Sequence, residues 1–131
     1  MSAPLDELLE AARVASRSSY SPYSRFRVGA AVFADGRIFA GANVENASYG
    51  LTICAERTAA FAAVLAGATR IEAVAVACVD APEGSAPTVL MPCGACRQVL
   101  AEFAGPETPV VVDRAGTFTV AELLPLAFRL G

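Results

Sequence analysis

Near the middle of this 131-residue chain lies the apolar run Ala73-Val74-Ala75-Val76-Ala77-Cys78-Val79. A short run in which neither face is polar is typical of a strand that is buried on both sides. Such a strand needs a covering layer on each face of its sheet, because otherwise its apolar side chains would lie in water. The run therefore predicts a central sheet between helices.

Further strands are predicted on both sides of this run. Asp35-Gly36 is a strong signal for a tight turn, so the segments before and after it are expected to form a hairpin. The small residues at Gly29-Ala30-Ala31 leave space for a close neighbour. The predicted strands besides the central one cover residues 26–33, 37–42, 109–112 and 117–119.

Helices are predicted where apolar residues recur at helical spacing or where stop signals follow. The first ends before Ser18, the second is closed by Gly67, and the last is halted at Pro125. These helices cover residues 5–15, 54–65, 94–103 and 121–124. We expect an α/β fold: a single domain over residues 1–131, built as a three-layer α/β/α sandwich with a central mixed sheet of about five strands.

The composition limits the class of partner. The chain is 55% hydrophobic and only 18% charged, which suggests apolar surface buried against other copies of itself. Its net charge is −3 and it has no run of Lys or Arg, which argues against nucleic acid as a partner. The longest apolar stretch, residues 58–69, is too short to cross a membrane. With no secretory signal, the sequence predicts a cytoplasmic protein that acts on a small uncharged molecule.

Three cysteines predict a metal site. Cys93 and Cys96 form a Cys-x-x-Cys pair, which serves zinc, iron–sulfur and redox chemistry alike. A third cysteine, Cys54, starts a predicted helix, and the chain contains no histidine, so zinc ligands must come from Cys, Asp or Glu. Three thiolates leave the fourth position of a tetrahedral zinc open, as in catalytic sites. Cys78 lies within the apolar strand and is expected to be a core residue.

Positive charge is expected around these thiolates, because together they outweigh the charge of zinc. Cys54 and Cys93 lie at predicted helix N-termini, where the helix dipole and free amide groups favour anions. Arg57 can donate hydrogen bonds to thiolate sulfurs, which would restore Lewis acidity to the metal. The alternative for Arg57 is a solvent-facing helix charge.

Glu56 supplies the proton chemistry that this site needs. It lies two residues after Cys54, on the first turn of the same predicted helix. A carboxylate beside zinc can take a proton from activated water and return protons to a ring nitrogen and a departing amine. Ligand-x-Glu followed by Pro-Cys-x-x-Cys is the known signature of zinc deaminases. The alternative is a carboxylate placed there only by the helix dipole.

These features resemble the cytidine deaminase family, in its short form with three cysteine ligands. The resemblance covers nearly the whole chain, and its blocks follow the family's order. It implies hydrolytic deamination of cytidine and deoxycytidine to uridine and deoxyuridine in pyrimidine salvage, with one zinc per subunit. The matching blocks are residues 22–31, 41–49, 54–59, 92–98 and 122–125, together with Phe128.

The resemblance also implies roles in substrate binding. Asn43 and Glu45 would bind the ribose hydroxyls, and Phe26 would pack along the pyrimidine. The backbone of Ala55 and the side chain of Glu56 would read the edge of the base. From the residues alone, Phe26 is equally compatible with a core aromatic, whereas alternate residues such as Asn43 and Glu45 can share one face of a strand.

Family members are homotetramers, which agrees with the apolar composition. The resemblance implies that Ala47 and Tyr49 face the site of a neighbouring subunit and that Phe128 stacks on the base in another. Without the resemblance, Phe128 would be an ordinary C-terminal anchor.

Three other functions are compatible with parts of the pattern. A deaminase of a cytosine-containing antibiotic such as blasticidin S shares the cysteine blocks, but its counterparts of Phe26 and of Asn43-Val44-Glu45-Asn46 look different. A non-catalytic zinc module would need a fourth ligand, for which Cys78 is the candidate, and would give Glu56 no role. A redox role for Cys93 and Cys96 would require a reversible disulfide without metal.

Overall fold

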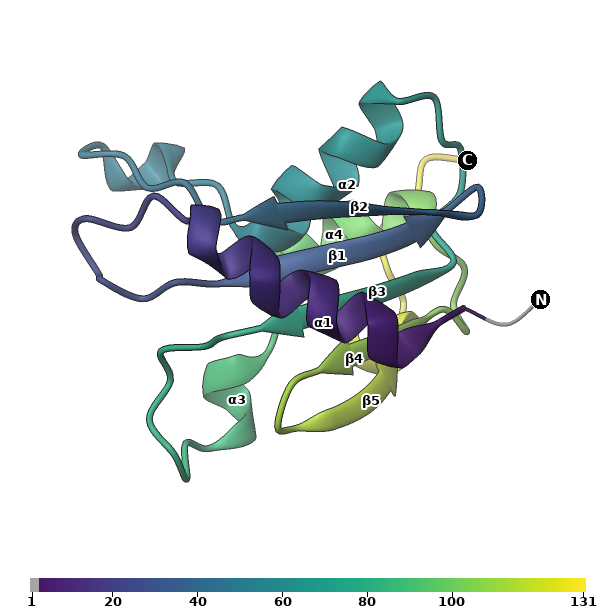
Figure 1. Cartoon of the computed structure of the whole chain (residues 1–131). Helices are drawn as coiled ribbons and strands as arrows, with labels where there is room; N and C mark the ends of the chain where they lie inside the picture. Colours follow the sequence, from purple (N-terminus) through teal and green to yellow (C-terminus); the bar gives the residue numbers. More distant parts are fainter. Residues whose placement is uncertain (1–2) are drawn as a thin grey trace.

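The apolar run forms the middle strand of a five-stranded sheet in the structure, a computed structural model that describes residues 3–131 (Figure 1). The strand order is β2-β1-β3-β4-β5. β3 and β4 are parallel, and the other neighbours are antiparallel, so the sheet is mixed as predicted. The strands are β1 (Gly29–Ala34), β2 (Arg37–Ala42), β3 (Ala73–Ala77), β4 (Pro109–Val112) and β5 (Gly116–Thr119).

Helices cover both faces of the sheet, which gives the predicted three layers. In Figure 1, α1 crosses one face, and α2 and α4 lie behind the other. The helices are α1 (Leu5–Ala15), α2 (Ala55–Leu65), α3 (Pro87–Leu90), α4 (Gly94–Phe103) and α5 (Val120–Leu123), with 3-10 turns at Ser16–Ser18 and Tyr49–Leu51. No helix in the described residues combines the length and apolar character needed to span a membrane.

The alternation of β3 explains how one strand serves two layers. Its alanines, Ala73, Ala75 and Ala77, pack in the cluster beneath α1. Its valines, Val74 and Val76, pack in the larger cluster beneath α2 and α4. Successive side chains of a strand point to opposite faces, so the small residues let α1 approach closely and the larger ones fill the other core.

The strand boundaries differ from the prediction on one side of the sheet. β1 begins at Gly29 rather than at residue 26, and β3 ends at Ala77 rather than at residue 79. Both differences lie at the same end, because Gly29 pairs with Ala77 across the two strands. The sheet opens beyond this pair, and the candidate site lies there. The short helix α3 was not predicted, because Pro, Gly and Ser around it read as a loop.

Gly29 marks the close approach that the sequence predicted. A Cβ atom at this position would collide with the backbone oxygen of Ala12 and would lie 2.6 Å from the backbone nitrogen of Ser16. We expect Gly29→Ala to lower the free energy of unfolding by about 3 kcal/mol, because backbone atoms of α1 cannot move aside as a side chain would. Urea unfolding measures the change. Gly50→Ala is the control, since a Cβ there meets nothing within 4 Å; equal losses in the two variants would contradict the packing described here.

Candidate metal centre and active site

Two helix N-termini converge to bring the three cysteines together. Cys54 is the N-cap residue of α2, and Cys93 is the N-cap residue of α4. Cys96 lies on the first turn of α4 and is buried. Neither N-cap side chain accepts a hydrogen bond from its own helix, so both sulfurs remain available as ligands.

The geometry of the sulfurs fits a tetrahedral zinc ion. The three Sγ atoms all lie within 4.8 Å of one another. The Sγ atoms of Cys54 and Cys93 are 3.8 Å apart, and those of Cys93 and Cys96 are 3.5 Å apart. With zinc–sulfur bonds of about 2.3 Å, a tetrahedron places its sulfur ligands about 3.8 Å apart. The three cysteines therefore form a zinc site that needs little rearrangement.

Arg57 supports the thiolate form of these ligands. Its Nη2 atom donates a hydrogen bond to Cys54 Sγ at 3.5 Å, as the sequence predicted. The pKa of the Cys54 thiol is lowered to about 5, first by a hydrogen bond from Cys96 and next by Arg57. Within the described residues, the buried Nε atom of Arg57 has no hydrogen-bond partner. Arg57 is thus a half-buried positive group whose guanidinium contacts a thiol of the cysteine cluster, rather than a charge that faces only solvent.

Cys78 does not belong to this cluster. It lies in the core with 7% of its surface exposed, and its thiol donates to the backbone oxygen of Leu90 at 3.7 Å. Burial raises the pKa of this thiol to about 11, which disfavours the thiolate that binds metal. The described residues offer three clustered cysteine ligands, so the fourth position of a tetrahedral ion would be open.

Glu56 is a buried acid beside the thiols. It lies on the first turn of α2 and is only 4% exposed. Burial raises the pKa of its carboxyl group to about 7, and the charge of Cys54 adds to this effect. A carboxyl group with such a pKa can both accept and donate a proton near neutral pH.

A cavity of about 160 Å³ opens onto these groups. Of the predicted substrate-binding residues, Phe26, Asn43 and Ala55 line it beside Cys54 and Glu56. A larger hollow of about 750 Å³ lies between α4 and the C-terminal segment, but its lining contains neither a cysteine nor Glu56. The chemistry therefore assigns the site to the smaller cavity. Its lining also includes residues that sequence reasoning did not select: Val28, Thr52, Cys78, Val89 and Met91.

Asn43 and Glu45 are both bound to the segment that precedes β1. Asn43 Oδ1 accepts hydrogen bonds from the Ser19 hydroxyl at 2.5 Å and the Val28 amide at 3.0 Å. Glu45 accepts bonds from the amides of Tyr23 and Ser24 and from the Ser24 hydroxyl. The Ser24 hydroxyl lowers the pKa of Glu45, and the two amides act in the same direction. Glu45 is buried but, unlike Asn43, is not part of the lining of the cavity within one chain.

The remaining predicted residues lie away from this chain's own cavity. Tyr49 is 62% exposed on a 3-10 turn, and Phe128 is 70% exposed in the C-terminal segment. Ala47 is also exposed, in the loop before that turn. Alternation with Phe26 along the chain was a signal that could have identified Val28. No comparable local signal marks Val89, which reaches the cavity from the unpredicted helix α3.

Comparisons with known proteins all identify the same family. The family described as "Cytidine and deoxycytidylate deaminase zinc-binding region" matches residues 3–112. A cytidine deaminase of Halalkalibacterium halodurans is 48% identical over 92% of this chain and 91% of its own length. A cytidine deaminase of Mycobacterium tuberculosis is 50% identical over 88% of this chain and 83% of its own length.

Solved structures show the same fold. The crystal structure of cytidine deaminase from Mycobacterium tuberculosis matches with a TM-score of 0.83 at 43% identity, covering 98% of this chain and 99% of that chain. The cytidine deaminase structure from Burkholderia pseudomallei matches with a TM-score of 0.82 at 45% identity, covering 94% of this chain and 98% of that chain. The predicted α/β architecture is therefore confirmed.

Proposed function

The chain belongs to the cytidine deaminase family of zinc enzymes, and from this premise we propose that it deaminates cytidine and deoxycytidine. The proposed products are uridine or deoxyuridine and ammonia, and the proposed role is pyrimidine salvage. The observation that carries the proposal is the position of Glu56, which lines one cavity with Cys54, Cys93, Phe26 and Asn43. We also propose that residues 1–131 form one catalytic domain.

The chemistry divides between the metal and Glu56. Cys54, Cys93 and Cys96 would hold the zinc ion, which would supply the Lewis acidity that makes water a nucleophile near neutral pH. The Glu56 carboxylate would accept one proton from the attacking water and donate it to the ring nitrogen, and would then move the second proton from the added hydroxyl group to the leaving amine. Water adds at the amine-bearing carbon and ammonia departs, so one oxygen replaces one nitrogen.

The hydrogen bonds that already hold Asn43 and Glu45 leave each of them capacity for ribose. The Asn43 amide nitrogen has two hydrogens and donates one to the backbone oxygen of Phe26 at 2.8 Å. The Glu45 carboxylate has about four acceptor positions and uses three of them on Tyr23 and Ser24. This spare donor and spare acceptor support the proposed contacts to sugar hydroxyls, with Phe26 along the pyrimidine and the Ala55 backbone at the base edge.

A comparison of substrates tests this assignment. We expect kcat/KM for cytidine and deoxycytidine to exceed that for free cytosine by about a hundredfold or more, because cytosine would leave the spare donor of Asn43 and the spare acceptor of Glu45 without a partner. Loss of the absorbance that depends on the ring amine follows turnover for each substrate. Blasticidin S, included as a fourth substrate, tests the rival antibiotic deaminase. Preference for cytosine or for the antibiotic would contradict the proposed function.

We further propose a homotetramer with shared sites, located in the cytoplasm. Ligand cavities usually measure about 300–1,000 Å³, so a cavity of about 160 Å³ supports additional walls from other copies. Ala47, Tyr49 and Phe128 are the exposed residues that would supply them, and Leu51 and Leu126 add exposed apolar surface. All four cysteines are free thiols, which supports a reducing compartment.

Light scattering on the purified protein is expected to give four times the mass of one chain. Phe128→Ala is expected to raise KM for cytidine about tenfold, by loss of base stacking, without changing zinc content. A fully active monomer, or an unchanged KM in this variant, would contradict shared sites.

A further inference from the structure

Residues 26–28, the segment before β1, lie outside the regular sheet but still lie between two neighbouring segments of the chain. At the start of β1, Gly29 pairs with Ala42 of β2 and with Ala77 of β3, and both pairings are antiparallel. The chain beyond Ala42 and Ala77 therefore continues alongside residues 26–28. The regular ladder ends here: the Asn43 amide still donates to the Val28 oxygen at 3.2 Å, and side chains make the other bonds to residues 26–28 described below.

On the β2 side, the side chain of a single asparagine adds to this backbone bond. Asn43 Oδ1 accepts a hydrogen bond from the Val28 amide at 3.0 Å, and Asn43 Nδ2 donates to the Phe26 oxygen at 2.8 Å. Asn43 thus holds the segment at two points along one edge.

On the β3 side, a single aspartate does the same. Asp80 Oδ2 accepts hydrogen bonds from the Arg27 amide and from Arg27 Nε, both at 2.8 Å. Asp80 Oδ1 accepts a bond from Arg27 Nη2 at 2.7 Å. One carboxylate therefore binds both the backbone and the guanidinium group of the same residue, in the geometry of a bidentate pair.

The loop that carries Asp80 is itself held to the sheet. Arg114 Nη2 donates to the Cys78 oxygen at 2.7 Å, and Arg114 Nη1 donates to the Ala81 oxygen at 3.1 Å. These bonds lie on either side of Asp80 in the chain, so the carboxylate is a fixed anchor. The segment before β1 is positioned against it.

Arg27 lies between two residues of the cavity wall. Phe26 and Val28 both line the cavity, and Cys78 lines it from the β3 side. We propose that the Arg27–Asp80 pair positions the Phe26 wall of the cavity against the wall that follows β3, and thereby sets affinity for the pyrimidine. This inference rests on the proposed function, because it places the base beside Phe26.

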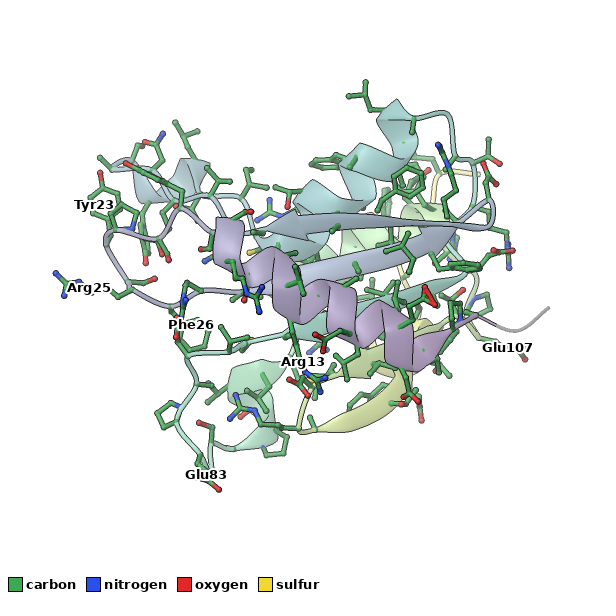
Figure 2. All side chains as sticks on the ribbon, in the orientation of Figure 1. Arg13, Tyr23, Arg25, Phe26, Glu83 and Glu107 are labelled. Carbon is green, nitrogen blue, oxygen red and sulfur yellow. The ribbon has the colours of Figure 1, made fainter. Side chains whose placement is uncertain are left out.

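A second arginine–aspartate pair provides a matched comparison. Arg13 Nη2 donates to Asp113 Oδ1 at 2.8 Å and Arg13 Nε donates to Asp113 Oδ2 at 3.1 Å. Its side chains are 44% and 16% exposed, against 50% and 24% for Arg27 and Asp80. Pairs this exposed contribute little to stability. Figure 2 labels Arg13 on α1 and Phe26 at the base of the loop that carries Tyr23 and Arg25, and Arg13 is not part of the cavity lining.

The test compares steady-state kinetics of zinc-loaded variants with cytidine. Asp80→Ala and Arg27→Ala are each expected to raise KM about tenfold with kcat within about twofold of the unmutated enzyme, since the proton chemistry at Glu56 is untouched. The double variant should be no worse than Asp80→Ala alone, because Asp80→Ala already removes the guanidinium bonds together with the bond from the Arg27 amide. Arg27→Lys should recover part of the loss, since an ammonium group can still bind one carboxylate oxygen. Hydrogen bonding from Arg27 lowers the pKa of Asp80 to about 2, so the effect should be the same across the neutral range.

Arg13→Ala is the control. Its KM is expected to equal that of the unmutated enzyme, and its thermal unfolding midpoint is expected to be similar to that of the unmutated enzyme. The inference is overturned if KM is unchanged in the Asp80 and Arg27 variants, or if their effects are additive. It is also overturned if they lose kcat and zinc together, which would indicate general damage. Failure of the proposed function is a separate result, because the unmutated enzyme would then show no cytidine turnover at all.

Discussion

Replacing Glu56 with glutamine is expected to lower kcat for cytidine by about three to four orders of magnitude while zinc stays bound. Glutamine keeps the size of the side chain but cannot accept a proton. The loss should be large because one carboxylate serves several proton transfers in the same reaction. Absorbance kinetics and zinc content are measured on the same sample.

The position of Glu56 allows its proton chemistry to be tested separately from metal binding. The side chain is buried beside the thiols but is not one of the three clustered ligands. Glu56→Asp, which retains a carboxylate one methylene further back, should fall between glutamine and the native residue. Near-normal turnover in zinc-loaded Glu56→Gln would contradict the mechanism, because Glu56 would then not carry the protons.

Replacing Cys96 with serine is expected to release zinc and to lower kcat/KM for cytidine by about a thousandfold or more, because the metal supplies several kcal/mol of transition-state stabilisation. Serine is nearly the same size, but its hydroxyl is not ionised near neutral pH. Cys96 is the buried ligand, so water is poorly placed to substitute for its sulfur. Zinc content by atomic absorption and turnover of cytidine give the two readings.

Cys78→Ala is the matched control for metal content. Cys78 is also a buried thiol, but it bonds to the Leu90 oxygen and lies outside the cluster. Zinc content should stay at the level of the unmutated protein. Loss of zinc from Cys78→Ala, or its retention in Cys96→Ser, would contradict the three-cysteine site.

The parts of the fold that depend on local pattern could be predicted from the sequence. The apolar run predicted a strand buried on both faces, and β3 has α1 on one side and α2 with α4 on the other. The Asp35-Gly36 turn forms the β1–β2 connection with both residues at positive φ. The metal ligands were also predictable, because Cys54 and Cys93 lie at the starts of α2 and α4, and the local sequence predicts where each of these helices begins.

The opening of the sheet could not be predicted in the same way. Residues 26–28 have the composition of a strand, but they lie outside the regular ladder: besides the backbone bond from Asn43 to Val28, the side chains of Asn43 and Asp80 bind them. Asp80 is 53 residues from Arg27 in the sequence, so no local signal links them. The cavity walls from Val89 and Met91 were missed for the same reason, since their position depends on how the loop after β3 returns to the site.

The most direct test of the zinc-dependent deaminase is a titration of zinc into chelator-treated protein, with cytidine turnover followed at each step. We expect the initial rate to rise in proportion to bound zinc and to level off at about one ion per chain, with one ammonia released for each cytidine consumed. A protein that takes up one zinc per chain and still leaves cytidine unchanged would contradict the account.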